Sequence, residues 1–139
     1  MLKNLGRLFL LTVILSVSAC AVMQPKTDEE RVIALAEQRQ AALLERDFLK
    51  AYQFMSPGYR SVKNLDRFKL ENAGAVNLLD FNVQSAECTE DTCTVSVVSD
   101  YKVALVGRGF SSKNPLVVDY FSKEIWIRSN GKWWFVKNE

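Results

Sequence analysis

The spacing of apolar residues changes near Gly74, and this change constrains the fold more than any other feature of the sequence. Before Gly74, apolar residues recur every three or four positions, as they do on one face of an α-helix. After it, apolar and polar residues alternate, which is typical of strands with one buried face. Helices followed by antiparallel strands predict an α+β fold in which the helices pack on one face of a curved sheet.

The helical half divides into two or three segments. Residues 27–30 follow the capping-box pattern and predict a helix start. The apolar stripe later changes phase, so we expect one helix over residues 28–46 and a second over 47–55. Pro57 and the glycine after it end the second helix, because both residues oppose its continuation. A third helix is expected over residues 61–71.

The second half holds about four strands. Apolar residues at most odd positions of 92–105 predict a long half-buried strand, and a β-rich stretch precedes residue 88. Another long strand covers residues 116–128. The Asn-Gly pair at 130–131 lies between apolar runs, which is the strongest short hairpin signal, and it turns this strand directly into residues 133–136.

The first 19 residues predict a secretion signal, in which a short basic segment precedes an apolar run at 8–17. This run is roughly half of the ~20 residues that a bilayer span needs, so a retained transmembrane helix is the weaker interpretation. The residues Val17-Ser18-Ala19-Cys20 resemble a bacterial lipobox. That resemblance implies cleavage after Ala19, thioether lipidation of Cys20 and acylation of the new amino terminus. An ordinary secreted protein is the alternative.

Lipidation of Cys20 would divide the chain into a signal peptide (1–19), a lipidated tether (20–27) and a folded domain (28–139). Several acyl chains such as palmitate, at ~0.8 kcal/mol per buried methylene, would make the anchor effectively permanent. Position 21 holds alanine rather than aspartate, which in the sorting pattern of lipoproteins from two-membrane bacteria favours the outer membrane. We therefore expect the domain in the bacterial cell envelope, at the periplasmic face of the outer membrane.

Cys88 and Cys93 remain as an even pair once Cys20 is assigned to lipid. If residues 90–91 form a two-residue hairpin loop, the two cysteines face each other at a non-hydrogen-bonded site with α-carbons ~4.5 Å apart. That distance is within disulfide reach. A structural disulfide is expected, because a redox pair normally has the spacing Cys-x-x-Cys at a helix start.

Charge and composition exclude several classes of function. The chain contains no histidine, so His-based catalysis and His-rich metal sites are excluded, and we expect no metal and no cofactor. Two of the 18 basic residues lie in the first 19 positions, which hold no acid, and this leaves 16 basic and 16 acidic residues in the remainder. A nucleic-acid partner is not expected, because phosphate binding needs clustered, uncompensated cations.

Two loose motifs lie at the second helix and at the end of the chain: Arg46-Asp47-Phe48-x-x-Ala51-Tyr52-x-x-Met55-Ser56-Pro57-x-Tyr59-Arg60, and Ile125-Trp126-Ile127-Arg128 followed by Asn130-Gly131-Lys132-Trp133-Trp134. They resemble the nuclear transport factor 2-like (NTF2-like) superfamily, and the resemblance spans about residues 28–139. It implies a cone of strongly bent sheet closed by helices around a pocket. The superfamily includes isomerases, dehydratases and epoxide hydrolases, and also noncatalytic ligand-binding, dimerisation and secretion-apparatus domains.

Enzymes of this superfamily generally place an aspartate with tyrosine, histidine or arginine partners inside the cone. Asp100 shares the polar face of its strand with Lys102, so it does not fit this role. Asp119 is the best available acid, and it could act as a base with a tyrosine as oxyanion donor. The possible hydroxyl donors on the strands are Tyr101 and Tyr120. The alternative is an acid near a strand end that faces solvent. Asp119 shares a face with Val117, Phe121, Ile125 and Ile127, which favours an inward orientation.

Aromatic residues and one arginine are the remaining candidates. Arg39 lies beside the apolar stripe of the first helix, where it could bind a carboxylate or phosphate, or lay its stem along the core with its head in water. Trp133 and Trp134 point to opposite faces of their strand, and the outward one either forms a contact surface or is covered by a loop. Residues 107–113 contain two glycines and are predicted to be a loop between strands rather than a phosphate site. The candidate ligand-binding residues are Tyr52, Tyr59, Tyr101, Tyr120, Trp126 and Arg39.

The sequence therefore favours a noncatalytic, lipid-anchored module that binds a small apolar ligand or a protein partner of an envelope assembly. The alternative is an isomerase- or dehydratase-type enzyme that uses Asp119 with tyrosine donors. A homodimer that uses Trp133 or Trp134 is a third hypothesis.

Overall fold

The computed structural model describes residues 26–74, 76–103 and 116–137. The predicted signal peptide, Cys20, most of the predicted tether and the predicted loop at 107–113 lie outside these residues. Within the described part of the chain, no helix is long and apolar enough to cross a membrane.

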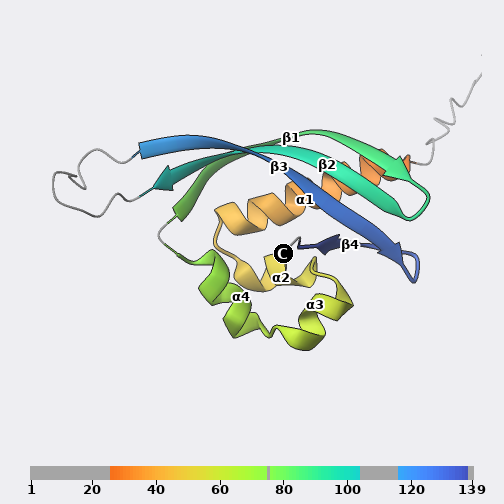
Figure 1. Cartoon of the computed structure of the whole chain (residues 1–139), viewed down its shortest axis with the longest axis horizontal. Helices are drawn as coiled ribbons and strands as arrows, with labels where there is room; N and C mark the ends of the chain where they lie inside the picture. Colours follow the sequence, from red (N-terminus) through yellow and green to blue (C-terminus); the bar gives the residue numbers. More distant parts are fainter. Residues whose placement is uncertain (1–25, 75, 104–115, 138–139) are drawn as a thin grey trace, which may run out of the picture.

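Four helices precede one antiparallel sheet of four strands, so the α+β fold predicted from the sequence is confirmed. The strands are neighbours in chain order, and Figure 1 shows the first helix along the concave side of the curved sheet with the three shorter helices beneath it. The helices are α1 (Asp28–Leu44), α2 (Phe48–Gln53), α3 (Pro57–Val62) and α4 (Leu65–Asn72), and the strands are β1 (Val76–Thr89), β2 (Thr92–Val103), β3 (Leu116–Ser129) and β4 (Lys132–Val136).

The capping box at the start of α1 is confirmed, because the backbone N–H of Thr27 donates to Glu30 Oε2 and the Thr27 hydroxyl accepts from the N–H of Glu30. The predicted end at residue 46 is corrected to Leu44. Arg46 adopts a left-handed backbone with φ 58°, which terminates a helix in the same way as a glycine at that position.

The expected helix boundaries after α1 also need correction. The second helix ends at Gln53 rather than residue 55, because Phe54 and Ser56 form backbone hydrogen bonds with Phe135 of β4. Pro57 begins α3 instead of ending a helix, since a proline fits the first helical position and the hydroxyl of Ser56 caps it. The third helix expected over 61–71 is two helices, α3 and α4, separated at Asn64, which caps α4.

Alternating burial along β2 matches the expectation from the sequence. Cys93, Val95 and Val97 are fully buried on the concave face, against the apolar stripe of α1. Their partners across the β2–β3 ladder are Trp126, Glu124 and Ser122. The even-numbered residues of β3 therefore face the concave side. The buried core contains Val32, Ala36, Ala42, Ala51, Met55, Phe68, Cys93, Val95, Val97, Trp126, Trp133 and Phe135.

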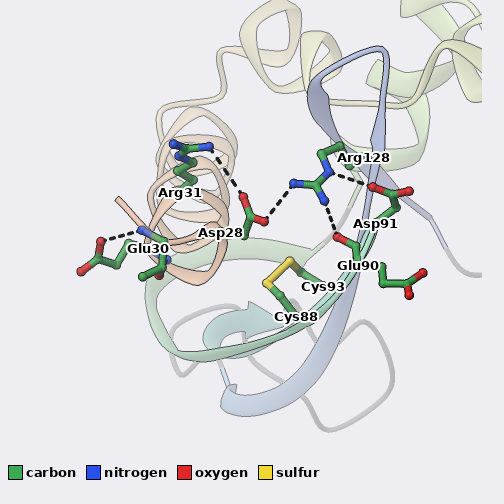
Figure 2. The surroundings of a disulfide bond; sticks show 9 residues. Asp28, Glu30, Arg31, Cys88, Glu90, Asp91, Cys93 and Arg128 are labelled. Carbon is green, nitrogen blue, oxygen red and sulfur yellow. Dashed lines mark hydrogen bonds and ion pairs between the residues drawn. A yellow bond between two sulfur atoms is a disulfide. The ribbon is translucent and has the colours of Figure 1, made fainter. Parts of the chain in front are cut away.

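The hairpin between β1 and β2 carries the predicted disulfide. Cys88 and Cys93 are bonded and their α-carbons lie 4.0 Å apart, so this expectation is confirmed. Figure 2 shows Arg128 of β3 beside this hairpin. Its guanidinium donates to Asp91 Oδ1 and Asp28 Oδ2 at 2.8 and 2.9 Å, and to the backbone carbonyl of Glu90 at 2.7 Å. One side chain thus joins β3, the hairpin and the start of α1.

Candidate functional site

Glu124 is a buried acid that the sequence analysis did not single out. Its side chain is 6% exposed and lies on the concave face of β3. Arg39 Nη1 and Gln40 Nε2 of α1 both donate to Glu124 Oε1, at 2.8 and 2.6 Å, and the indole N–H of Trp126 donates to Oε2 at 3.0 Å. Both carboxylate oxygens are therefore occupied by protein donors.

Arg39 is enclosed together with this carboxylate. Its guanidinium carbon lies 3.7 Å from the centre of the Phe135 ring, which is a close cation–π contact. Burial lowers the pKa of Arg39, while Glu124, Tyr101 and Tyr59 act to raise it. The interpretation that leaves its head in water is wrong, because the residue is 7% exposed. Within the structure, Arg39 binds a carboxylate of its own chain.

A carboxylate whose two oxygens both accept hydrogen bonds from the protein is better suited to stabilising the fold than to proton transfer. A general base needs a lone pair within reach of the substrate, and donors already fill both oxygens of Glu124. Two buried atoms of the cluster, Arg39 Nε and Gln40 Oε1, have no hydrogen-bond partner among the described residues. Sequence reasoning could have found Glu124 only by knowing which face of β3 turns inward.

Asp119, the candidate catalytic acid, does not have the expected orientation. It is exposed, and it lies on the convex face of the sheet directly across from Asp100 of β2. Tyr101 and Tyr120, its proposed hydroxyl partners, lie on the concave face instead. The prediction counted its apolar neighbours on alternate positions as core, but two of them, Val117 and Phe121, belong to the same exposed stretch as Asp119.

Tyr52 and Tyr59, two predicted ligand-binding residues, organise the helical layer. The Tyr52 hydroxyl donates to the backbone carbonyl of Lys63 at 2.8 Å. Both tyrosine rings pack against Phe68 of α4, with centroid distances of 5.5 and 6.3 Å. These contacts join α2, α3 and α4 around one aromatic cluster.

Glu71, near the C-terminal end of α4, forms ion pairs with lysines and accepts a hydrogen bond from the Tyr59 hydroxyl. It pairs with Lys137, which follows β4, at 2.9 Å and with Lys63 at 3.2 Å, and the Tyr59 hydroxyl donates to it at 3.2 Å. Hydrogen bonds from Lys137 and Lys63 lower the pKa of Glu71 to about 2. Burial and the Glu71 charge raise the pKa of Tyr59 to about 12, so this phenol stays protonated at neutral pH.

Tyr101 and Tyr120 lie together on the concave face, with ring centres 6.4 Å apart. Tyr101 lines a small cavity of about 140 Å³ that Leu43 of α1 and Leu78 of β1 also line. The six predicted ligand-binding residues therefore lie in three places: the helical layer, the buried Glu124 cluster, and this pair. The cavities lined by described residues do not bring all six together.

A larger groove lies between α1, the end of α2 and the β3–β4 hairpin, with a volume of about 450 Å³. Trp133 is buried and faces the concave side, whereas Trp134 is half-buried on the opposite face, so the predicted division of the two tryptophans is confirmed. Both nevertheless line the groove at its hairpin end. The full lining is Lys26, Arg31, Ala34, Leu35, Gln38, Gln53, Phe54, Gly131, Lys132, Trp133 and Trp134.

Charge in this groove is uneven. Lys26, Arg31 and Lys132 contribute three cations, and none of the described residues that line it is acidic. Arg31 forms a long ion pair with Asp28 at 3.7 Å, and its side chain stays 53% exposed. Lys26 and Lys132 have no ion-pair partner among the described residues. An apolar floor with this cationic rim is the arrangement with the clearest chemical preference, because it suits a ligand with an apolar body and an acidic group.

Comparisons with known proteins support the fold and leave the function open. No protein-family model and no curated protein matches the chain. A SEC-C motif containing protein from Rhodopseudomonas palustris is 20% identical, with a TM-score of 0.56 over 76% of this chain and 75% of that chain. A protein from Campylobacter jejuni described as an NTF2-like transpeptidase is 14% identical, with a TM-score of 0.47 over 76% of this chain and 96% of that chain.

The first of these likenesses shows a shared fold and nothing about activity, because the identity is low. The helices under a curved antiparallel sheet are also the layout that the NTF2-like resemblance implies. Membership of that superfamily stays a prediction from the sequence. The chain is an α+β protein that shares the fold of the Rhodopseudomonas protein.

Proposed function

We propose that this chain is a noncatalytic binding module, anchored by lipid at Cys20 to the periplasmic face of the outer membrane, and that it binds a small amphiphile with an acidic group. The observation that carries the proposal is the groove beside Trp133 and Trp134, which combines an apolar floor with three cations. Its volume of about 450 Å³ falls within the range of small-molecule sites.

Two other cavities are larger but suit an acidic ligand less well. One of about 500 Å³ is lined by Glu37 and by no cation among the described residues. The other cavity measures about 630 Å³ and lies beside Tyr59. Its two cations, Lys63 and Lys137, already pair with Glu71, so their charge is compensated within the protein. Three cations without a lining acid make the tryptophan groove the better site for an anion.

The position of the groove also fits an anchor at Cys20. Lys26 lines the groove and is separated from Cys20 by only six positions. A chain of that length spans at most about 20 Å when fully extended. A lipidated Cys20 would therefore keep the groove close to the membrane surface, where amphiphiles concentrate.

The groove is tested by titrating the purified protein with dodecanoate, below its micellar concentration, while tryptophan fluorescence is recorded. Saturable binding is expected, with weaker binding of butanoate, which lacks the apolar chain. Lys132→Gln should weaken dodecanoate binding about tenfold, since a hydrogen bond to a charged group contributes about 1.5–3 kcal/mol. It should leave the binding of dodecanol, an uncharged ligand of equal length, unchanged.

Lys50→Gln is the matched control, because Lys50 is an exposed cation of α2 outside the groove. Equal effects of the two substitutions, or no saturable binding, would contradict the proposed ligand class. The anchor is tested separately by Cys20→Ser, which should abolish acyl labelling and release the protein from the membrane fraction. Retention of the label would disprove lipidation at Cys20.

A further inference from the structure

The first part of β3 has a backbone edge that no described strand covers. β4 pairs only with Ile125–Ser129, and the edge of β4 itself is covered by the segment from Phe54 to Ser56. Residues 116–124 of β3 pair with β2 on one side only. An uncovered edge of this length is a template for a further strand, and proteins normally protect such edges.

The opposite edge of the sheet is protected in a way that this one is not. β1 carries irregularities between Leu78 and Asp80 and between Val83 and Ser85, where one residue is extra relative to β2. Bulges of this kind twist an edge and discourage pairing. The β2–β3 ladder runs without a register shift from Leu116 to Ile127, so the β3 edge is regular.

The side chains along this edge are apolar to an unusual degree for a solvated strand. Tyr120 is 59% exposed and Phe121 is 55% exposed. Leu116, Val117 and Val118 are exposed as well, so apolar side chains project from both faces of the same segment. Contiguous exposed apolar residues on a regular edge indicate an interface with another chain.

The backbone directions determine which residues could pair. The N–H of Arg128 donates to the carbonyl of Asp91, in the turn before β2, so even-numbered residues of β3 turn their backbone groups toward β2. Odd-numbered residues therefore present their N–H and C=O groups at the open edge. In residues 116–124 these are Val117, Asp119, Phe121 and Lys123.

We infer that this edge pairs antiparallel with the same edge of a second copy of the chain, with Phe121 on the two-fold axis. In this register Phe121 meets its counterpart and Asp119 of each copy lies opposite Lys123 of the other copy. All these positions have outward backbone groups, so the pairs satisfy the antiparallel hydrogen-bond pattern. An isologous interface requires this kind of self-complementarity.

Charge selects this register over its neighbour. Asp119 of β3 is already paired with Asp100 of β2, and like charges directly opposite each other on neighbouring strands are destabilising. Neither Asp119 nor Lys123 has an ion-pair partner among the described residues. The register centred on Phe121 gives both of them a partner, whereas one centred on Tyr120 places Asp119 against Phe121 and Lys123 against Val117.

The first experiment measures the dimer by sedimentation of the full mature chain in density-matched mild detergent. The unchanged chain should dimerise at micromolar concentration. Asp119→Lys and Lys123→Asp should each weaken the dimer by at least about tenfold, because like charges then face each other across the axis. The double variant Asp119→Lys/Lys123→Asp should restore it, which a general loss of folding could not do.

The second experiment tests the register by oxidative cross-linking on non-reducing gels. Phe121→Cys should form a covalent dimer, since paired α-carbons at such a site are about 5.5 Å apart. Lys123→Cys alone should not, because the two copies of position 123 would lie about 13 Å apart along the strands. A mixture of Asp119→Cys and Lys123→Cys chains should cross-link with each other.

The unchanged chain, which retains Cys20 and the Cys88–Cys93 pair, is the control for cross-linking by native cysteines. A monomer at all concentrations would overturn the inference. So would a dimer that is insensitive to both charge reversals, a Phe121→Cys chain that cross-links only to a different protein, or equal cross-linking at positions 121 and 123.

Discussion

The two halves of β3 belong to one continuous strand, yet they have opposite environments. We call residues 116–121 the exposed half and residues 122–129 the buried half. Every residue of the exposed half is exposed, and β4 does not reach it. Most of the buried half, residues 125–129, lies between β2 and β4. This half carries Glu124, Trp126 and Arg128, each of which has partners from other elements or within the Glu124 cluster.

The difference shows that the elements packed against a strand determine which of its residues are buried, more than the hydrophobicity of those residues does. The exposed half is richer in apolar residues than the buried half, but α1 packs against Glu124 and β4 pairs with residues 125–129. Glu124, an acid, is 5% exposed as a residue, whereas Phe121 is 55% exposed. A charged residue is tolerated there because three donors occupy its oxygens.

The largest expected effect comes from removing the acid of the buried half. Glu124→Ala should lower the free energy of unfolding by about 3–5 kcal/mol, because Arg39 is left buried without its counter-charge. Urea denaturation followed by circular dichroism measures the change. Lys123→Ala, at the preceding position on the convex face, should change stability by less than about 0.5 kcal/mol at a concentration where the protein is a monomer. Similar losses for the two variants would show that the two faces of β3 do not differ in their contribution to stability.

The double variant Arg39→Met/Glu124→Leu tests whether an unpaired charge is the cause of that loss. It replaces the ion pair with apolar side chains of similar size, so most of the stability lost by Glu124→Ala should return. If the double variant is as unstable as the single one, the cause is the loss of packing or of the hydrogen-bond acceptor for Gln40 and Trp126, and not the unpaired charge.

The second effect concerns the hairpin that packs beside the buried half. Replacing both Cys88 and Cys93 with serine should lower the free energy of unfolding by about 2 kcal/mol, since closing so short a loop restrains few unfolded conformations. Thermal unfolding with and without a reductant measures it. The reductant should destabilise the unchanged protein and leave the double-serine variant unaffected. If the reductant destabilised both proteins equally, the disulfide would not be the cause of the stability difference.

A third test uses pH to separate the helical layer from β3. The pKa of Glu71 in the folded protein is about 2, below its ordinary value of 4.5, so its contribution to stability is present above pH 4.5 and is lost as the pH falls toward 2. Glu71→Gln should therefore be less stable than the unchanged protein at pH 7 and should converge with it near pH 2. Denaturation curves across this range provide the comparison. A constant difference at all pH values would show that the Glu71 charge is not responsible.

The smallest effect is expected in the exposed half. Tyr120→Ala should cost less than about 1 kcal/mol, because the side chain is largely in water and leaves no cavity. Trp126→Ala, on the same face six positions further along, should cost about 3–5 kcal/mol. Both are measured by urea denaturation at a concentration where the protein sediments as a monomer. A large loss for Tyr120→Ala would show that this half is covered in solution.

Much of the secondary structure could be predicted from local sequence. The capping box at Thr27 and Glu30, the Asn130-Gly131 hairpin and the alternation along β2 depend on interactions within a few residues. Both Asn130 and Gly131 have positive φ, as the hairpin signal requires. The helix ends were predicted less well, because the segment around Met55 pairs with β4, which lies far away in the sequence.

The sequence by itself determined the order of helices and strands, the two hairpins and the disulfide, because each follows from local backbone geometry. Only the tertiary structure decided which face of β3 is buried. Apolar residues occupy both alternating sets of that strand, so a shift of one residue would have been equally consistent with its pattern. The register with β2, together with donors 84 and 85 positions away on α1, turned Glu124 inward and Asp119 outward.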